Sequence, residues 1–112
     1  MMEGIGRRMN ELHEKLIKLK ETIKIVADCF YQQKDQEGYR GLITIIDDIT
    51  AVSVILEGQQ EKEEVLLLNN RLQAALKQAL DAMEQQDKVL MADIMNYDVT
   101  ELLDEIINLN ME

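Results

Sequence analysis

The sequence predicts an all-α fold, an antiparallel bundle of four helices, and three observations support this prediction. Proline is absent, aromatic residues make up only 4% of the chain, and 46% of the residues are apolar. The commonest types are mostly strong helix formers. Apolar residues also recur at alternating spacings of three and four, as on one face of a helix. The 112 residues are enough for one domain with a modest core, and we expect a single domain over 1–112.

The first segment carries the clearest helical pattern. We expect a helix over about 9–33, with Asn10 as its N-cap. Asp35 and Gly38 follow it and suit a short connection. The apolar face of this helix is a seam held over nearly three heptads, which indicates packing on other helices: Leu12, Leu16, Leu19, Ile23, Val26 and Phe30.

The second segment, "GLITIIDDITAVSVILEG", is rich in β-branched residues, which favour strands. Two features outweigh that preference. The adjacent Asp47 and Asp48 break strict alternation, and the run is longer than an ordinary strand. We therefore predict a helix over 39–57, with Gly58 at its C-terminus. Its seam is Leu42, Ile45, Ile49, Val52 and Leu56, and further isoleucines widen the apolar surface.

The third segment begins near residue 61 and has one apolar face formed by Val65, Leu68, Leu72, Leu76, Ala79 and Met83. Its end is open to two interpretations. No glycine or proline interrupts "MEQQDKVL", so the helix can continue to residue 97. A break near 85–88, with Asp87 as N-cap, would instead give four helices of similar length.

The apolar pattern changes near Asp98. On one ideal helix, the face of Leu90, Ile94 and Tyr97 lies roughly 100–130° from the face that follows, so a straight helix does not place both in one core. Asp98 and Glu101 have the spacing of a capping box. We therefore predict a separate short helix over 99–110, which could open locally as a lid; the alternative is one continuous helix wrapped on two sides.

Charge and composition exclude several classes of partner. The chain has 22 acidic and 12 basic residues, a net charge of −10. Nucleic-acid and anionic-membrane binding draw on clustered Lys and Arg, so we expect neither. The longest apolar stretch, residues 42–56, contains two aspartates and is too short to span a membrane. The N-terminal residues do not read as a signal peptide, and one cysteine makes no internal disulfide, so we expect a cytoplasmic protein.

Catalytic and metal-binding patterns are also missing. The single histidine, His13, has no Glu three residues before it, so the di-iron motif of helical bundles is absent. His13 and Cys29 lie about 24 Å apart along one predicted helix and cannot form a catalytic pair. A carboxylate site from Asp47, Asp48, Asp93 and Asp98 is conceivable, but such residues are usually solvated. We expect no enzyme activity, no cofactor and no metal.

A protein-binding surface is the remaining functional hypothesis. Methionines gather near the end of the third segment, and flexible thioethers suit adaptable surfaces, although buried methionine is the commoner case. The aromatic ring of Tyr97 fits the same apolar face. The candidate partner surface consists of Met91, Met95, Tyr97, Leu102 and Ile106.

The stretch "MEQQDKVLMADIMNYDVTELLDEI", residues 83–106, resembles small uncharacterised bacterial helical proteins. The resemblance is carried by Glu84, Asp87, Asp93, Tyr97 and the apolar positions between them. More loosely, the stretch is similar to the helical-bundle flagellin export chaperones, which implies a bundle that binds an apolar protein segment. The stretch carries no catalytic signature.

The sequence thus indicates a small acidic cytoplasmic binding or adaptor protein, chaperone-like, that acts through protein–protein contacts. The alternative is a self-associating structural bundle. Apolar residues lie off the main seams at Ile17, Ile25, Ile43 and Ile55, and leftover apolar patches mark interaction sites, so a homodimer is expected.

Overall fold

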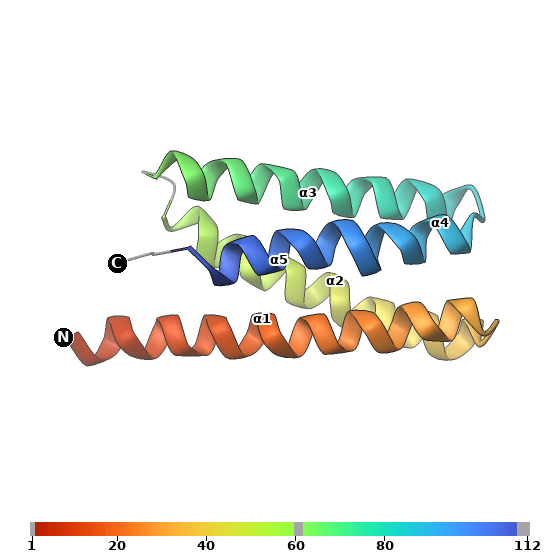
Figure 1. Cartoon of the computed structure of the whole chain (residues 1–112), viewed down its shortest axis with the longest axis horizontal. Helices are drawn as coiled ribbons and strands as arrows, with labels where there is room; N and C mark the ends of the chain where they lie inside the picture. The colour runs from red at the N-terminus through yellow and green to blue at the C-terminus, as the bar shows by residue number, and fades with distance from the viewer. Residues whose placement is uncertain (1, 60–61, 110–112) are drawn as a thin grey trace.

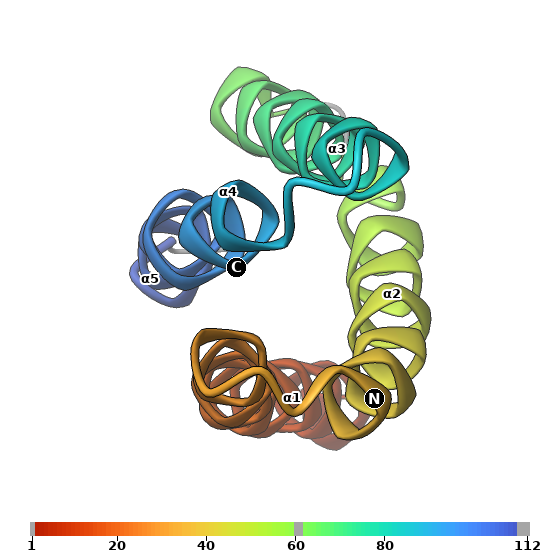
Figure 2. The ribbon, with the colours of Figure 1, turned by 90° about the vertical axis from the view of Figure 1, so that its right-hand side faces the viewer.

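The computed structural model describes residues 2–59 and 62–109, and within these ranges the chain is helical with no strand. The helices are α1 (Met2–Tyr31), α2 (Asp35–Glu57), α3 (Glu63–Glu84), α4 (Lys88–Asp93) and α5 (Thr100–Ile107). A π-helical segment, η1 (Ile94–Val99), joins α4 to α5, so that the three form one continuous rod. The four rods run in alternating directions (Figure 1) and surround a central core (Figure 2). The predicted all-α antiparallel bundle is confirmed.

The core is built mainly from the seams that the sequence predicts on the first three rods, but on α3 the predicted Leu76 and Met83 are only partly buried. Leu16, Leu19 and Ile23 of α1 are 0% exposed, as are Ile45 of α2 and Leu72 of α3. Asn10 lies inside α1 and is therefore not its N-cap. The predicted ends at residues 61 and 110 lie outside the described residues. Because the buried positions repeat at helical spacing, apolar burial fixes the face that each rod presents to the core.

The second segment forms one uninterrupted helix, α2, despite its β-branched residues, as the spacing of its seam predicts. It begins at Asp35, four residues earlier than expected, so Gly38 lies in the helix and not in the connection. A Cβ at Gly38 would lie 2.8 Å from the Phe30 ring, and one at Gly41 would lie 2.3 Å from Val26 Cγ2. The two glycines therefore let α1 and α2 approach closely at this end of the bundle.

Gly41→Ala tests this close approach. The added methyl should collide with Val26, which is only 4% exposed and stiff at χ1, and overpacking typically costs about 1–3 kcal/mol. The higher helix propensity of alanine compared with glycine offsets up to about 1 kcal/mol of this cost. We expect a net loss in the free energy of unfolding by urea. In a Val26→Ala background, which removes the collision, Gly41→Ala should be neutral or stabilising; an equal loss in both backgrounds would contradict the steric explanation.

Two connections, at residues 32–34 and 85–87, share one geometry. Gln33 and Gln86 both have φ of 62°, in the left-handed region where helix ends usually place glycine. The N–H groups of Lys34 and Asp87 each bond to a carbonyl five residues earlier, at 2.7 and 2.9 Å. This Schellman-type ending stops α1 and α3 without glycine. Helix α4 then begins with Asp87 as N-cap, its carboxylate accepting a bond from the Leu90 N–H at 3.1 Å.

The break therefore falls at 85–87, and the predicted break at Asp98 is wrong. Asp98 lies inside η1 and caps nothing, since the start of α5 has no side-chain cap. In a π-helical turn the hydrogen bonds run to the fifth residue, so the turn holds one more residue than an α-helical turn. The Thr100 hydroxyl donates to the Met95 carbonyl at 3.2 Å, and the Thr100 N–H donates to the Tyr97 carbonyl. The widened turn shifts the apolar stripe without a new helix.

Candidate binding groove

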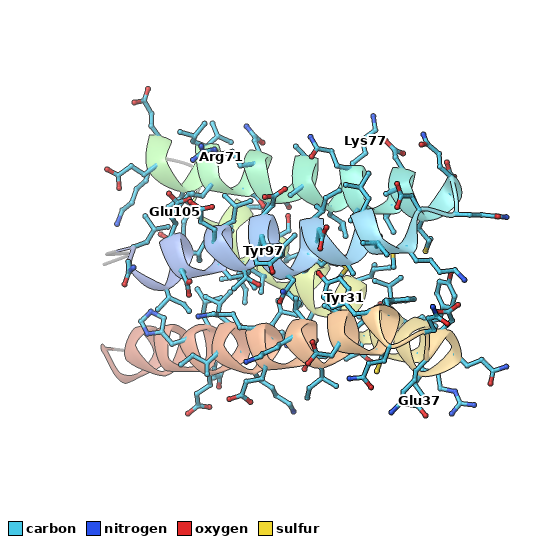
Figure 3. The ribbon with its side chains drawn as sticks, turned by 45° about the vertical axis from the view of Figure 1, so that its right-hand side comes forward. Tyr31, Glu37, Arg71, Lys77, Tyr97 and Glu105 are labelled. Atoms are coloured by element: carbon cyan, nitrogen blue, oxygen red, sulfur yellow. The ribbon has the colours of Figure 1, made fainter. Side chains whose placement is uncertain are left out.

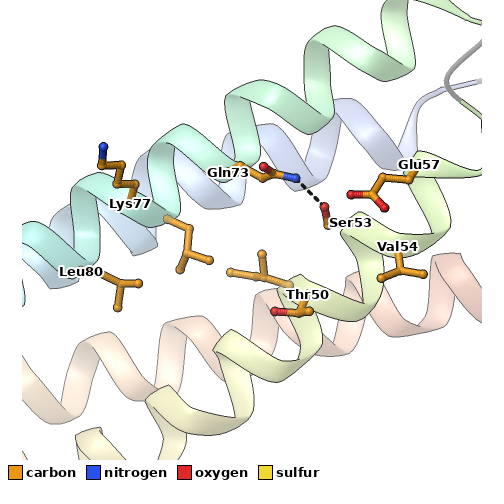
Figure 4. Close-up of a pocket in the computed structure, with 9 residues that line it drawn as sticks. Thr50, Ser53, Val54, Glu57, Gln73, Lys77 and Leu80 are labelled. Atoms are coloured by element: carbon orange, nitrogen blue, oxygen red, sulfur yellow. Dashed lines mark hydrogen bonds between the residues drawn. The ribbon is translucent and has the colours of Figure 1, made fainter.

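Helices α2 and α3 leave an open groove between them. Helix α2 packs mostly against α1 and makes far fewer contacts with α3. In the ribbon it crosses behind the bundle from the end of α1 to the start of α3 (Figure 1). The open space between the two helices has a volume of about 420 Å³. Figure 4 shows the side chains that line it. It is lined by Ile49, Thr50, Ser53, Val54 and Glu57 of α2 and by Gln73, Leu76, Lys77 and Leu80 of α3.

A hydrogen-bonded polar cluster lies where the two helices meet. The Ser53 hydroxyl donates to Asn69 Oδ1 at 2.8 Å, and Gln73 Nε2 donates to Ser53 Oγ at 2.8 Å (Figure 4). Ser53 is 7% exposed and Asn69 is 2% exposed. Buried polar groups cost free energy unless they are paired, so these bonds favour one register of α2 against α3. The cluster places the Gln73 amide in the groove, beside apolar walls.

The rim of the groove combines an exposed apolar side chain with two charges. Val54, which lines the groove, is 61% exposed. Glu57 lines the α2 side and Lys77 the α3 side, and Figure 4 shows them toward opposite ends of the groove. The chemistry available is therefore apolar contact, one polar notch and two opposite charges.

Most residues of the predicted partner surface are buried in the structure. Met91 and Ile106 are 0% exposed, Met95 is 2% exposed and Leu102 is 9% exposed. These four side chains belong to the core, because η1 turns both parts of the stripe inward. The expectation that the Tyr97 ring packs on the apolar face is wrong, since this side chain is 64% exposed. Within this set, Tyr97 alone is open to a partner (Figure 3).

A second polar cluster lies between the end of α1 and the last rod. The Tyr31 hydroxyl donates to Asp93 Oδ1 at 2.5 Å, and Asn96 and Tyr97 lie close enough to act on the same hydroxyl. Partial burial, followed by the hydrogen bond to Asp93, raises the pKa of Tyr31 to about 12. The bond ties α1 to α4 immediately before the π-helical segment.

Tyr31→Phe should change the alkaline limit of stability. The pKa of Tyr31 rises from 10.0 to about 12 on folding. The stabilisation that the protonated Tyr31 hydroxyl gives the folded state is therefore fully present below pH 10 and is lost as pH rises from 10 to 12. Difference absorbance near 295 nm between the wild type and Tyr31→Phe should show one phenol titrating near pH 12, and unfolding by urea at pH 10–12 should depend less on pH in the variant. A phenol titrating near pH 10 would contradict the bond to Asp93.

A shallower hollow of about 300 Å³ lies between α3 and the last rod. Arg71 on one side and Glu105 on the other (Figure 3) form an ion pair, with 3.8 Å between Arg71 Nη1 and Glu105 Oε2. Asp98 and Glu101 also line the hollow and add negative charge. Both partners of this ion pair are about half exposed, so it contributes little to stability. Among the residues that the structure describes, no three His, Cys, Asp or Glu side chains are placed to hold a metal ion.

The groove was not predicted from the sequence, although two signals for it exist. Val54 extends the apolar surface of α2 beyond its seam and lines the groove, and Ser53 and Gln73 are polar residues at positions that flank two seams. Of the isoleucines off the seam, Ile46 is partly buried against the core and Ile43 is exposed, and neither lines the groove.

The chain was compared with known families, curated proteins and solved structures. Residues 8–109 match the family model described as "Domain of unknown function (DUF8042)". No curated protein and no solved structure matches the chain. In the described ranges, none of the helices combines the length and the apolar character needed to cross a membrane.

Proposed function

This chain belongs to the DUF8042 family, and we propose that it is a small acidic binding or adaptor protein that acts through protein–protein contacts, in the manner of a chaperone. The observation that supports this proposal is the groove between α2 and α3. Its apolar walls with a few convergent polar groups are the usual composition of a binding site. We propose a cytoplasmic location and no catalytic activity, because the groove holds no acid–base or nucleophilic constellation.

Site-directed photocrosslinking tests the binding function. A photoreactive phenylalanine analogue replaces Val54 on the groove rim or, as a matched control, Val89 on α4. The two valines are similarly exposed, at 61% and 56%, so neither replacement disturbs the core. We expect a defined crosslinked protein from Val54 in cells and none from Val89. The same crosslinks from both positions, or none from Val54, would contradict a partner in the groove.

Self-association is the second candidate function, and exposed apolar residues favour it. Ile17 is 51% exposed, Ile25 64% and Ile55 41%, as expected for residues off the seams. Ile17 and Ile25 are eight residues apart on α1, a spacing that keeps both on one side of the helix, and Ile55 lies on α2. Sedimentation equilibrium at high protein concentration distinguishes the two functions. A monomer mass contradicts the homodimer, whereas a dimer that Val54→Gln dissociates contradicts the adaptor.

A further inference from the structure

We infer that the groove takes an amphipathic α-helix that has an apolar stripe and is flanked by basic residues. This inference rests on the proposed binding function and adds the chemical class of the partner. It follows from three properties of the groove: the helices that form its walls, the apolar character of those walls, and the charge of the molecule around it.

The walls favour a helix over an extended peptide. One common mode for an extended peptide is to add a strand to an open sheet edge, and the described residues form no strand that could offer such an edge. Two helices side by side instead present ridges of side chains into which the ridges of a third helix fit. The lining residues of α2 run from Ile49 to Glu57, which is about 12 Å of helix. A bound helix would contact this length over about two turns.

The side chains favour an apolar stripe with one polar position. Val54, Leu76 and Leu80 leave an apolar surface open between the two helices. The hydrogen-bonded pair of Ser53 on α2 and Gln73 on α3 bridges the two walls (Figure 4). A helix placing two or three leucine-sized side chains at i, i+3 and i+4 would cover the apolar part. A small polar side chain of the partner helix, placed opposite Gln73, would form a hydrogen bond with the Gln73 amide.

Charge complementarity selects a basic partner. The chain carries a net charge of −10, so the potential around it attracts basic segments and repels a second copy of the same chain. Glu57 lines the α2 rim, and the exposed Asp47 lies further along the same helix. Lys77 on the α3 rim supplies the one positive charge in the lining. A partner helix therefore matches the groove when Lys or Arg lies on the side that faces α2. On the side that faces α3, Lys77 favours acidic or neutral residues.

Synthetic peptides of 18 residues test this inference by fluorescence anisotropy with the full chain at about 0.15 M salt. The first peptide has a leucine stripe at i, i+3, i+4 and i+7 with lysine flanks. The second has the same stripe with glutamate flanks, and the third has the composition of the first in scrambled order. We expect the first peptide to bind at least tenfold more tightly than either of the others. Equal binding of the first and third would show charge attraction alone and overturn the inference.

Neutral substitutions locate the binding site. Val54→Gln should weaken the first peptide about tenfold, whereas Val89→Gln, equally exposed on α4, should leave its affinity unchanged. Circular dichroism should show that both variants keep the helical fold. Equal effects of the two substitutions would place the peptide elsewhere, and equally tight binding of the glutamate peptide would exclude a basic partner. Each of these outcomes overturns the inference.

The crosslinking and peptide experiments fail in distinguishable ways. If Val54 crosslinks a protein in cells but no basic amphipathic peptide binds, the binding function stands and the assigned partner chemistry is wrong. If the chain is a dimer that Val54→Gln dissociates, a second copy occupies the groove, and both proposals fail. The inference is supported when the lysine peptide binds, Val54→Gln weakens it and the mass without peptide is that of a monomer.

Discussion

Ile49→Asp should unfold the domain or lower its thermal midpoint by about 12–20 °C. Ile49 is 1% exposed in the middle of α2, so the new carboxylate would be buried without a partner. An uncompensated buried charge costs about 3–5 kcal/mol, a large part of the 5–15 kcal/mol that stabilises a typical domain. For a domain of this size each kcal/mol moves the midpoint by about 4 °C. Circular dichroism at 222 nm during heating measures the change.

Ile43→Asp is the matched control for this prediction. It makes the same chemical change on the same helix, six residues away, but Ile43 is 66% exposed. Its carboxylate would remain hydrated, and the free energy of unfolding should change by no more than about 0.5 kcal/mol. The contrast between the two variants measures burial directly. If both melt at the wild-type temperature, Ile49 does not lie in the core.

The same comparison explains why most of the fold was predictable. Ile43 and Ile49 have identical β-branched side chains, so residue type does not distinguish their environments. Their environments are distinguished by position, because only residues that follow the alternating spacing of three and four lie on the one face that a helix presents to the core. That repeat correctly outweighed the strand preference of α2 and gave the seams of the first three rods. It failed at the connections, where the decisive feature is a backbone conformation.

Gln33 and Gln86 show what the periodicity does not contain. Both end a helix in the left-handed region, a position that usually holds glycine. No glycine or proline marks an end in "MEQQDKVL", and it was the possible N-cap at Asp87 that kept the correct break near 85–88 open as an alternative. The hydrogen bonds show the end clearly, because the Asp87 N–H reaches back to the Ala82 carbonyl at 2.9 Å. Both connections contain two adjacent glutamines, and this similarity was a further available signal.

The binding groove was not predictable, because it depends on how two rods diverge. The crossing of α2 from α1 toward α3 follows from tertiary packing, in which Gly38 and Gly41 permit a close approach to α1. A single helix pattern assigns a face but not its neighbours. The predicted partner surface failed for a related reason. It assumed that methionines near a change of stripe are exposed, whereas the widened turn buries them.

Deletion of Asp98 should leave the stability of the domain unchanged or raise it. Asp98 is exposed within η1, where one extra residue is accommodated by bonds to the fifth residue. Removing one residue should return this turn to α-helical bonding to the fourth residue. Val99, Leu103 and Ile106, each 0% exposed, would then keep their places in the core. Urea unfolding should give a free energy equal to or above that of the wild type.

Deletion of Asn70 is the control, since it removes one exposed residue from a regular α-helix. No wide turn absorbs the change, so every later residue of α3 rotates by about 100°. Gln73 would then take the position of Leu72, which is 0% exposed. Losing a buried leucine and burying a polar side chain should cost about 3–5 kcal/mol or prevent folding. If the two deletions destabilise the domain equally, η1 does not accommodate an extra residue, and the shift of the stripe at Asp98 requires another explanation.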